Sequence, residues 1–158
     1  MRILFVMAGA GVILFMLIQR FAGAKTLSPD IDSLIKYQAD HWSVEYALVK
    51  AIVKVESNFD PDAKNPHDPS YGLMQITPIL AQEYGLVKDW RSPTYDEIKA
   101  IMNPMTNLDI GCRFLNHLSK YPFAQMVQSY NVGETGYRNG ARSPEYLEKV
   151  RKYYEIYS

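Results

Sequence analysis

The sequence predicts an all-α domain with one long polar loop, preceded by a separate apolar segment at the N-terminus. Polar capping residues, most of them followed by proline, recur along the chain as helix start signals. Apolar residues after each signal return at intervals of three and four, the period of a helix. No convincing run of alternating polar and apolar residues indicates a sheet. The length of 158 residues favours one domain with an appendage.

Six helices are predicted in order from these signals. Their expected starts are Ser28-Pro29-Asp30, Ser43, Thr77-Pro78, Asn103-Pro104, Pro122 and Ser143-Pro144-Glu145. Proline suits the first helical position because the N–H that it lacks has no helical partner there. The apolar faces that justify these helices are, in the same order, Ile31/Leu34/Ile35, Ala47/Leu48/Ala51/Ile52/Val55, Leu80/Ala81/Tyr84, Leu108/Cys112/Leu115/Leu118, Val127/Tyr130 and Tyr146/Leu147/Val150/Tyr153.

The long loop extends from Asn58 to Tyr71 and is rich in Asn, Asp and Pro. A small hairpin fits between Asp60 and Tyr71. The predicted fold class is therefore all-α with at most this one small β element.

Residues 1–24 form a separate piece. An unbroken apolar run of 16 residues extends from Ile3 to Ile18. This run is slightly short for a membrane span, which needs about 17–25 residues, and slightly long for a secretory signal. Ala22-Gly23-Ala24 fits the small-residue pattern of a signal cleavage site. The prediction is an uncleaved membrane anchor or a cleaved signal peptide at 1–24, and an exported domain at 25–158.

Composition excludes several classes of protein. The 17 basic and 17 acidic residues balance, so no basic excess indicates a nucleic-acid partner. The single cysteine, Cys112, excludes an intrachain disulfide and is expected to pack in the core. The three histidines, His41, His67 and His117, lack the spacing of metal ligands. We therefore expect neither a metal site nor a cofactor.

Glu56 is the first candidate for chemistry. It lies at the end of the second predicted helix, beside the apolar face that includes Ile52 and Val55. A helix C-terminus and apolar neighbours both disfavour a carboxylate, so both raise its pKa. A glutamate with a pKa lifted towards 6 or higher, from about 4.3, acts as a general acid near neutral pH. The segment alone also fits an exposed glutamate at a helix end.

Two other segments carry groups suited to a polar ligand. Gly72 to Gln75 follows the loop, where glycine permits close backbone approach and Gln75 offers a donor and an acceptor. Tyr130-Asn131 ends the fifth predicted helix with an aromatic ring and an amide. Taken singly, each segment also fits a helix cap and core packing.

Together and in this order, these segments resemble the catalytic domain of the SLT-type lytic transglycosylases, relatives of goose-type lysozyme. The resemblance runs from about Ile31 to Tyr154. It rests on four signatures: Glu56-Ser57-Asn58-Phe59, Gly72-Leu73-Met74-Gln75, Asn103-Pro104-x-x-Asn107 with Gly111, and Tyr130-Asn131.

The resemblance implies a lysozyme-like helical fold with a saccharide groove and no cofactor. It implies that Glu56 is the sole catalytic carboxylate. The residues expected to bind substrate are Ser57, Asn65, Met74, Gln75, Tyr130, Asn131 and Tyr146.

The chain departs from the family pattern in two places. Asn65-Pro66 replaces a serine before proline, and asparagine still has the groups to hydrogen-bond an acetamido substituent. Arg142-Ser143 stands where many members carry a glutamate-threonine pair before the last helix. The second departure bears on how the site is supported.

The implied reaction is cleavage of peptidoglycan between N-acetylmuramic acid and N-acetylglucosamine, with formation of 1,6-anhydro-N-acetylmuramic ends. The implied location is the cell envelope, on the periplasmic side of the inner membrane. The membrane, through the N-terminal segment, and glycan strands are the expected partners. An envelope-spanning machine or, for a phage-encoded protein, a virion assembly complex also fits.

Two other functions remain open from the sequence. Hydrolysis of the lysozyme type needs a second carboxylate, for which Asp60, Asp62 and Asp68 are the candidates. A membrane-tethered module that binds glycan without cleaving it needs the groove but not the acid.

Overall fold

The computed structural model describes residues 30–65 and 68–158, and in that part of the chain it contains eight helices and one two-stranded hairpin. The helices are α2 (Ile31–His41), α3 (Tyr46–Ser57), α4 (Pro78–Glu83), α5 (Tyr95–Met102), α6 (Pro104–Leu118), α7 (Phe123–Val132), α8 (Glu134–Arg138) and α9 (Pro144–Tyr157). The hairpin pairs β1 (Lys64–Asn65) with β2 (Ser70–Tyr71) in antiparallel register. The prediction of a helical fold with one small hairpin is therefore confirmed.

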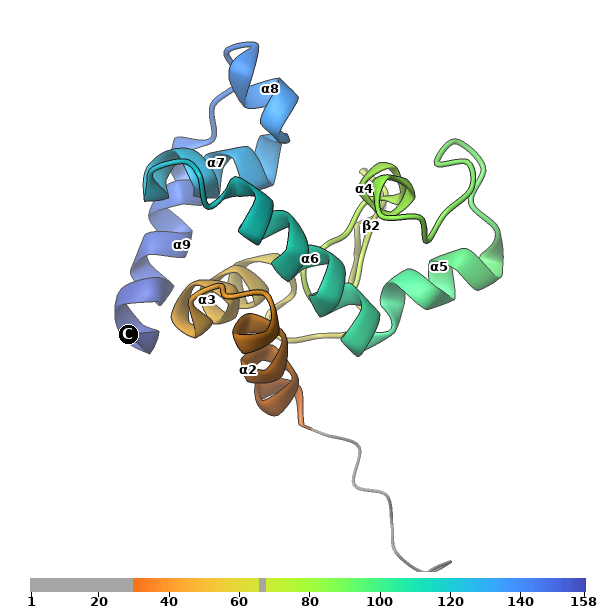
Figure 1. Cartoon of the computed structure of the whole chain (residues 1–158), viewed down its shortest axis with the longest axis horizontal. Coiled ribbons are helices and arrows are strands. Elements are labelled where there is room, and N and C mark those ends of the chain that lie inside the picture. The colour runs from red at the N-terminus through yellow and green to blue at the C-terminus, as the bar shows by residue number, and fades with distance from the viewer. Residues whose placement is uncertain (1–29, 66–67) are drawn as a thin grey trace, which may run out of the picture.

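Helix α6 crosses the middle of the domain, and α9 lies at one side of it with the C-terminus (Figure 1). Helix α3 packs against α9, and α6 packs against α2, α5 and α7. The side chains fully buried between them include Ile35, Ile52, Leu108, Leu115, Val127 and Val150. The predicted apolar faces supply this core. Cys112 is also fully buried, as expected, and burial raises the pKa of its thiol to about 12.

Three proline signals mark helix starts correctly. Helices α4, α6 and α9 each have proline in the first turn. The Thr77 side chain accepts a hydrogen bond from the N–H of Leu80, and Asn103 accepts one from Thr106. These bonds satisfy N–H groups that the helix itself leaves without a partner.

The predicted cap of α3 at Ser43 is wrong by two residues, because Glu45 is the N-cap and the helix begins at Tyr46. Ser43 has a φ of 53° and donates its N–H to the carbonyl of Asp40, so it belongs to the turn after α2. The cap of α2 is Asp30, whose side chain accepts from the N–H of Ser33. Ser28 and Pro29 lie outside the described residues.

Two helices were not predicted. Helix α5 begins with a capping box in which Thr94 and Glu97 exchange side-chain and backbone hydrogen bonds. That Thr-x-x-Glu signal was present in the sequence. Helix α8 has only five residues, too few for a periodic pattern.

The predicted anchor or signal at 1–24 lies outside the described residues. Within 30–65 and 68–158, none of the helices has the length and apolar character that crossing a bilayer requires.

Candidate active site

Glu56 lies in the last turn of α3, which ends at Ser57. Asn58 caps this end in the left-handed conformation, and Phe59 also has a positive φ, so the chain turns sharply away from the helix axis. The hydroxyl of Ser57 donates back to the carbonyl of Val53. The helix therefore ends where the sequence predicted, with the Glu56 carboxyl at the edge of the core.

The protonation state of Glu56 is set by two opposing effects. Burial raises the pKa of its carboxyl from 4.5 to about 7. The hydroxyl of Tyr146 donates a hydrogen bond of 2.6 Å to Oε1 of Glu56, which lowers the pKa and offsets part of the increase. Near neutral pH the carboxyl is therefore poised between its acid and base forms, as a general acid–base group requires.

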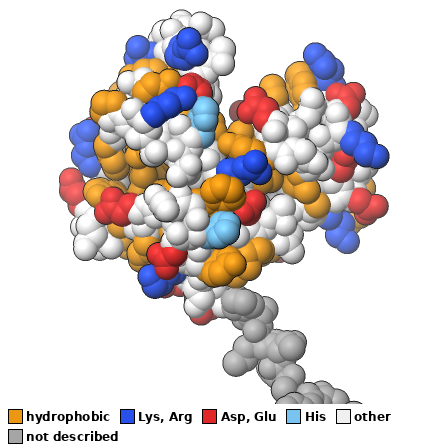
Figure 2. Space-filling model, viewed as in Figure 1, with side chains coloured by type: hydrophobic (Ala, Val, Ile, Leu, Met, Phe, Trp, Pro, Cys, Tyr) orange, Lys and Arg blue, Asp and Glu red, His pale blue; other side chains and the backbone are white. Residues whose placement is uncertain are grey.

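Glu56 lines a cavity of about 570 Å³. Helices α4 and α8 lie on either side of it, and Figure 2 shows the molecular surface hollowed between the two lobes that carry them. Its walls include the hairpin, α4, the end of α7 and the start of α8. The lining side chains are Glu56, Asn65, Asp68, Ser70, Gln75, Thr77, Ile79, Leu80, Glu83, Phe114, Tyr130, Asn131, Val132, Glu134 and Thr135, with Gly133 and Gly136.

The side-chain amide of Gln75 is fixed by the hairpin. Its Nε2 donates to the carbonyls of Gly72 and Ala63, and its Oε1 accepts from the hydroxyl of Ser70. Gln75 itself has a φ of 47°, a strained value for a residue with a side chain. The amide that the sequence assigned to a ligand thus lines the cavity but already has protein partners on both atoms.

Asn107 joins this segment to α6. Its Oδ1 accepts from the N–H of Met74 at 2.7 Å, and its Nδ2 donates to the carbonyls of Tyr71 and Ile101 at 2.7 and 2.9 Å. A Cβ atom on Gly72 would lie 2.6 Å from Nδ2 of Asn107, so glycine is required at this position. The Asn107 signature therefore corresponds to a buried polar clamp that sets the position of the 71–76 turn.

Met74 and Tyr130 support the floor of the cavity. Met74 is fully buried, packs against Gly111, and does not line the cavity. The hydroxyl of Tyr130 donates to the carbonyl of Met74 at 2.8 Å, and its ring lies 5.7 Å from the ring of Phe114. Of these predicted substrate contacts, only Tyr130 faces the cavity.

The other expected contacts divide in the same way. Asn65 and the exposed Asn131 line the cavity. Ser57 does not line the cavity, and its hydroxyl donates to a carbonyl within α3. Tyr146 is buried behind Glu56 and reaches the site through its hydrogen bond to that carboxyl. The structure therefore brings Glu56, Asn65, Gln75, Tyr130 and Asn131 to one surface.

Three further carboxylates line the cavity, and only one was a candidate from the sequence. Asp68 lies in the hairpin turn, whereas Asp60 and Asp62 do not line the cavity. Glu83 and Glu134 were missed, because nothing in the sequence indicates that α4 and α8 face each other across Glu56.

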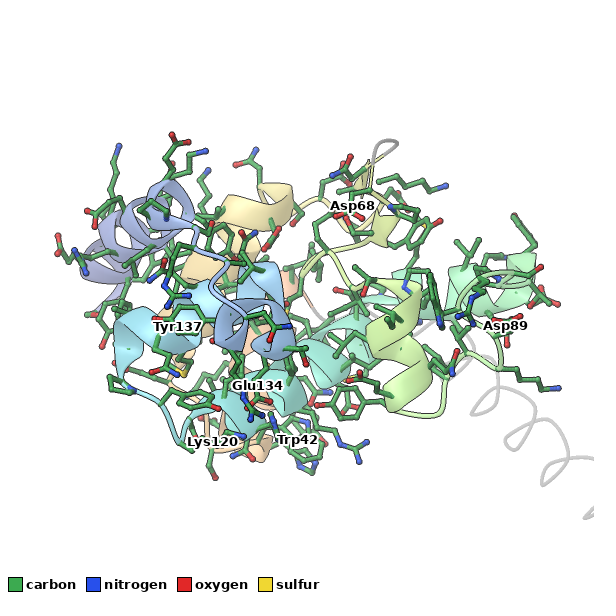
Figure 3. All side chains as sticks on the ribbon, turned by 90° about the horizontal axis from the view of Figure 1, so that it is seen from above. Trp42, Asp68, Asp89, Lys120, Glu134 and Tyr137 are labelled. Atoms are coloured by element: carbon green, nitrogen blue, oxygen red, sulfur yellow. The ribbon has the colours of Figure 1, made fainter. Side chains whose placement is uncertain are left out.

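Glu134 is held in an ionised state by its neighbours. Tyr121 donates to it at 2.6 Å, and His117 and Lys120 pair with it at 2.7 and 2.9 Å. These contacts, Tyr121 first, lower the pKa of Glu134 to about 2. Figure 3 shows Lys120 and Glu134 side by side, toward the edge opposite Asp68.

Arg142 makes its hydrogen bonds and its ring contact away from Glu56. Its guanidinium donates to the carbonyls of Tyr137 and Ala141 and lies over the ring of Tyr137. Ser143 donates its N–H to Oε1 of Gln128. In this chain the support that the structure gives Glu56 comes from Tyr146.

Within the described residues, no group of three or more His, Cys, Asp or Glu side chains is arranged to hold a metal ion.

Comparison with known proteins identifies the family. Residues 33–151 match the Transglycosylase SLT domain, so the chain belongs to this family. The predicted family membership is therefore confirmed.

Named relatives include the membrane-bound lytic murein transglycosylase E of Buchnera aphidicola, 35% identical over 91 residues that cover 56% of this chain and 39% of that protein. The endo-type membrane-bound lytic murein transglycosylase A of Salmonella paratyphi B is 32% identical over 107 residues, covering 63% of this chain and 50% of that protein. The chain thus spans half or less of the length of these relatives.

Solved structures share the fold. The 70 kDa soluble lytic transglycosylase of Escherichia coli matches with a TM-score of 0.62 and 25% identity, over 78% of this chain and 23% of that one. An inactive variant of the lytic transglycosylase Slt of Pseudomonas aeruginosa matches with a TM-score of 0.59 and 18% identity, over the same shares of the two chains.

Proposed function

We propose that this protein is a peptidoglycan lytic transglycosylase in which Glu56 is the single general acid and base. The observation that carries the proposal is the Glu56 carboxyl on the cavity wall, with a pKa of about 7. Both proton-transfer roles need such a value near neutral pH. The relatives, named as lytic murein transglycosylases, support the same substrate.

In the proposed reaction, protonated Glu56 donates its proton to the bridging oxygen that follows N-acetylmuramic acid. The bond from C1 to this oxygen breaks, and the acetamido oxygen of the same sugar meets the positive charge that develops at C1. Ionised Glu56 then takes the proton of the C6 hydroxyl, whose oxygen bonds to C1. The products are a 1,6-anhydro end and a free hydroxyl, with no net addition of water.

The surrounding groups suit this cycle. Burial favours the neutral carboxyl that must donate first, and the Tyr146 hydroxyl stabilises the carboxylate that forms afterwards. Asn65 and Asn131 on the cavity wall have the donors and acceptors to bind acetamido groups. The ring of Tyr130 offers an apolar face to a pyranose.

Hydrolysis of the lysozyme type is the second candidate, because Asp68 lines the same cavity as Glu56. Retaining and inverting enzymes place two carboxylates roughly 5–5.5 Å or 6.5–9.5 Å apart. We favour the single-carboxylate reaction because the chain belongs to the transglycosylase family.

Mass spectrometry of digested peptidoglycan separates the two reactions. The wild-type protein should release fragments that end in the 1,6-anhydro ring, whereas hydrolysis yields reducing ends. Glu56→Gln should lower the rate by at least about 10²–10⁴-fold, since it removes the only transferable proton. Glu83→Gln, a carboxyl in the same cavity, serves as the matched control and should lose less than about tenfold.

A binding module without catalysis is the remaining alternative. It predicts that the wild-type protein and Glu56→Gln both bind a cell-wall suspension and that neither clears it. Clearing by the wild-type protein alone supports the enzyme.

We further propose that residues 1–24 attach or deliver the domain at 25–158 to the envelope, on the periplasmic side of the inner membrane. The full chain should sediment with membranes if the segment is an anchor. A chain that starts at Lys25 should remain soluble and active on isolated wall. N-terminal sequencing of the exported protein decides between the two forms, since a first residue of Lys25 identifies a cleaved signal.

A further inference from the structure

Arg113 is an exposed arginine on α6 that lies over two aromatic rings. Its guanidinium carbon lies 4.5 Å from the ring centroid of Tyr84 and 5.5 Å from that of Trp42. Guanidinium groups stack on aromatic faces through their own plane, which leaves the N–H donors at the edge directed elsewhere.

The Trp42 ring is itself fixed to α6. The ring Nε1 donates to Oδ1 of Asp109 at 2.9 Å. The backbone carbonyl of Trp42 accepts from Nδ2 of Asn116 at 2.8 Å. Asp109 makes no ion pair with Arg113, although the two lie one turn apart. The acid nearest in sequence therefore positions the ring and does not neutralise the arginine.

In the part of the chain that the structure describes, the N–H donors of Arg113 have no acceptor. Arg113 forms no hydrogen bond and no ion pair with any residue within 30–65 and 68–158. Two lysines also lie over pairs of rings, but Lys50 pairs with Asp32 and Lys54 bonds Asn58. Arg113 is thus a preorganised cation whose hydrogen-bonding capacity remains for a ligand.

Arg113 does not itself line the cavity, but residues next to it and next to its partner Tyr84 do. Phe114, the next residue on α6, lines the cavity, and so does Glu83, the residue before Tyr84. In Figure 3, Trp42 lies toward the same edge as Glu134 and away from Asp68. Arg113 and Tyr84 are therefore the direct chain neighbours of two lining residues, close enough for a polymer that leaves the cavity to meet them.

The charges of the cavity lining and of Arg113 indicate which substrate group Arg113 binds. The described residues that line the cavity include four carboxyl groups, those of Glu56, Asp68, Glu83 and Glu134, and no lysine, arginine or histidine. An anionic group of a substrate is repelled by Asp68 and Glu83, whereas the charge of Glu134 is offset by its ion pair with Lys120. The guanidinium of Arg113 attracts such a group. A carboxylate also matches the fork of N–H donors on a guanidinium.

We propose that Arg113 binds a carboxylate of the substrate, namely one on the peptide stem of the glycan strand that occupies the cavity. This inference rests on the proposed function, because it takes the peptidoglycan strand as the ligand. Arg113 then favours strands that carry stems over uncharged saccharides of the same length.

Binding to the Glu56→Gln protein tests the proposal without cleavage. Calorimetry compares three probes: glycan strands with their peptide stems, the same strands after an amidase has removed the stems, and an N-acetylglucosamine oligomer without carboxylates. The stem is joined to the lactyl group of the sugar by an amide bond, and amidase treatment frees that lactyl carboxylate as it removes the stem. The first probe therefore carries only stem carboxylates and the second only lactyl carboxylates.

Adding Arg113→Met should weaken binding of stem-bearing strands about tenfold, which corresponds to about 1.4 kcal/mol. It should have a far smaller effect on the oligomer. Arg113→Lys keeps the charge but not the paired N–H donors of the guanidinium, so its affinity for stem-bearing strands should lie between those of arginine and methionine at this position. Arg91→Met is the matched control, since Arg91 is exposed and lies over one ring, that of Trp90. It should leave all three affinities unchanged.

An equal loss for all three probes, or no loss for any, overturns the proposal. An equal loss for both strand probes, or a loss for the amidase-treated strands alone, overturns the assignment to the stem; the second result gives the anion as the lactyl carboxylate, which is free only in those strands. Thermal unfolding of each variant shows that the fold is kept. Failure of the wild-type protein to cleave peptidoglycan contradicts the proposed function, whereas binding that depends on Arg113 stands on its own measurement.

Discussion

The hydroxyl of Tyr146 donates a 2.6 Å hydrogen bond to Oε1 of Glu56, a residue 90 positions earlier in the chain. Helices α3 and α9 carry the two residues and pack against each other. Burial raises the pKa of the carboxyl, and this bond lowers it, so the value near 7 is a balance between the two. The contact therefore gives α9 direct influence over the group proposed to transfer the proton.

Tyr146→Phe should shift the pH–rate profile to higher pH. Loss of the hydroxyl removes the contact that lowers the pKa of Glu56, so the carboxyl stays protonated further into the alkaline range. Clearing of cell-wall suspensions, measured across pH for the wild-type and variant proteins, reports this shift.

Tyr154→Phe provides the control for this shift. Tyr154 lies on the same helix and donates to the exposed Glu45 instead. An unchanged profile for Tyr146→Phe, or a shift to lower pH, contradicts the assignment of Glu56 as the titrating group.

Glu56→Gln should also change how stability depends on pH. The folded protein holds the Glu56 proton up to a pKa of about 7, and the unfolded chain only up to about 4.5. Unfolding therefore releases a proton between these values, and wild-type stability falls as pH rises through that window. The variant lacks this dependence, so relative to it the wild-type protein loses up to about 3 kcal/mol by neutral to slightly alkaline pH.

Urea denaturation of both proteins at several pH values measures the difference. Glu134→Gln is an informative comparison, because the pKa of Glu134 is lowered to about 2. The contribution of ionised Glu134 to stability is present above about pH 4.5 and is lost as the pH falls towards 2. This dependence on pH is opposite to that of Glu56. A Glu56 variant whose stability relative to wild type does not change with pH would show that burial does not shift this carboxyl.

Local chemistry made much of the fold predictable. Thr77 and Asn103, each followed by proline, fix helix starts through bonds to residues three positions on. The active site is built both from residues near one another in the sequence and from residues that only tertiary packing brings together. The position of Glu56 at a helix end follows from nearby residues, but its partner Tyr146 comes from another helix. The cavity acids Glu83 and Glu134 likewise face Glu56 only because of tertiary packing.

Some roles could not be read from residue type alone. Gln75 has the donors and acceptors of a ligand-binding residue, yet a φ of 47° turns its amide into the hairpin. Met74 belongs to the same signature but is needed as packing for Gly111. A motif identifies which residues matter in such a segment, whereas the backbone decides whether each faces substrate or supports a neighbour.

A second essential carboxylate should not be found among Asp60, Asp62 and Asp68. Asp60 and Asp62 do not line the cavity, so Asp→Asn changes there act as matched controls for Asp68→Asn. Each change should lower the cleavage rate less than about tenfold, or about 1.4 kcal/mol in transition-state stabilisation. Product analysis should still give 1,6-anhydro ends. A loss for Asp68→Asn as large as that for Glu56→Gln, with reducing ends, would establish hydrolysis instead.

Asn107→Ala should destabilise the fold and lower activity together. The side chain is fully buried, and its three hydrogen bonds hold the turn that carries Met74 and Gln75. Alanine leaves the N–H of Met74 and two carbonyls without these partners, at a cost of about 3 kcal/mol or more. Urea denaturation gives the stability, and wall clearing at a temperature where the variant is still folded gives the effect on the site.

Asn103→Ala separates this clamp from the general stability of α6. Asn103 caps the same helix by accepting from the N–H of Thr106, and loss of a cap costs about 1 kcal/mol. It does not hold the 71–76 turn, so the folded Asn103 variant should clear cell wall at the wild-type rate. The folded Asn107 variant should be slower, because the hairpin that positions Gln75 loses its attachment to α6. Equal rates for the two folded variants would show that Asn107 stabilises the core without positioning the cavity wall.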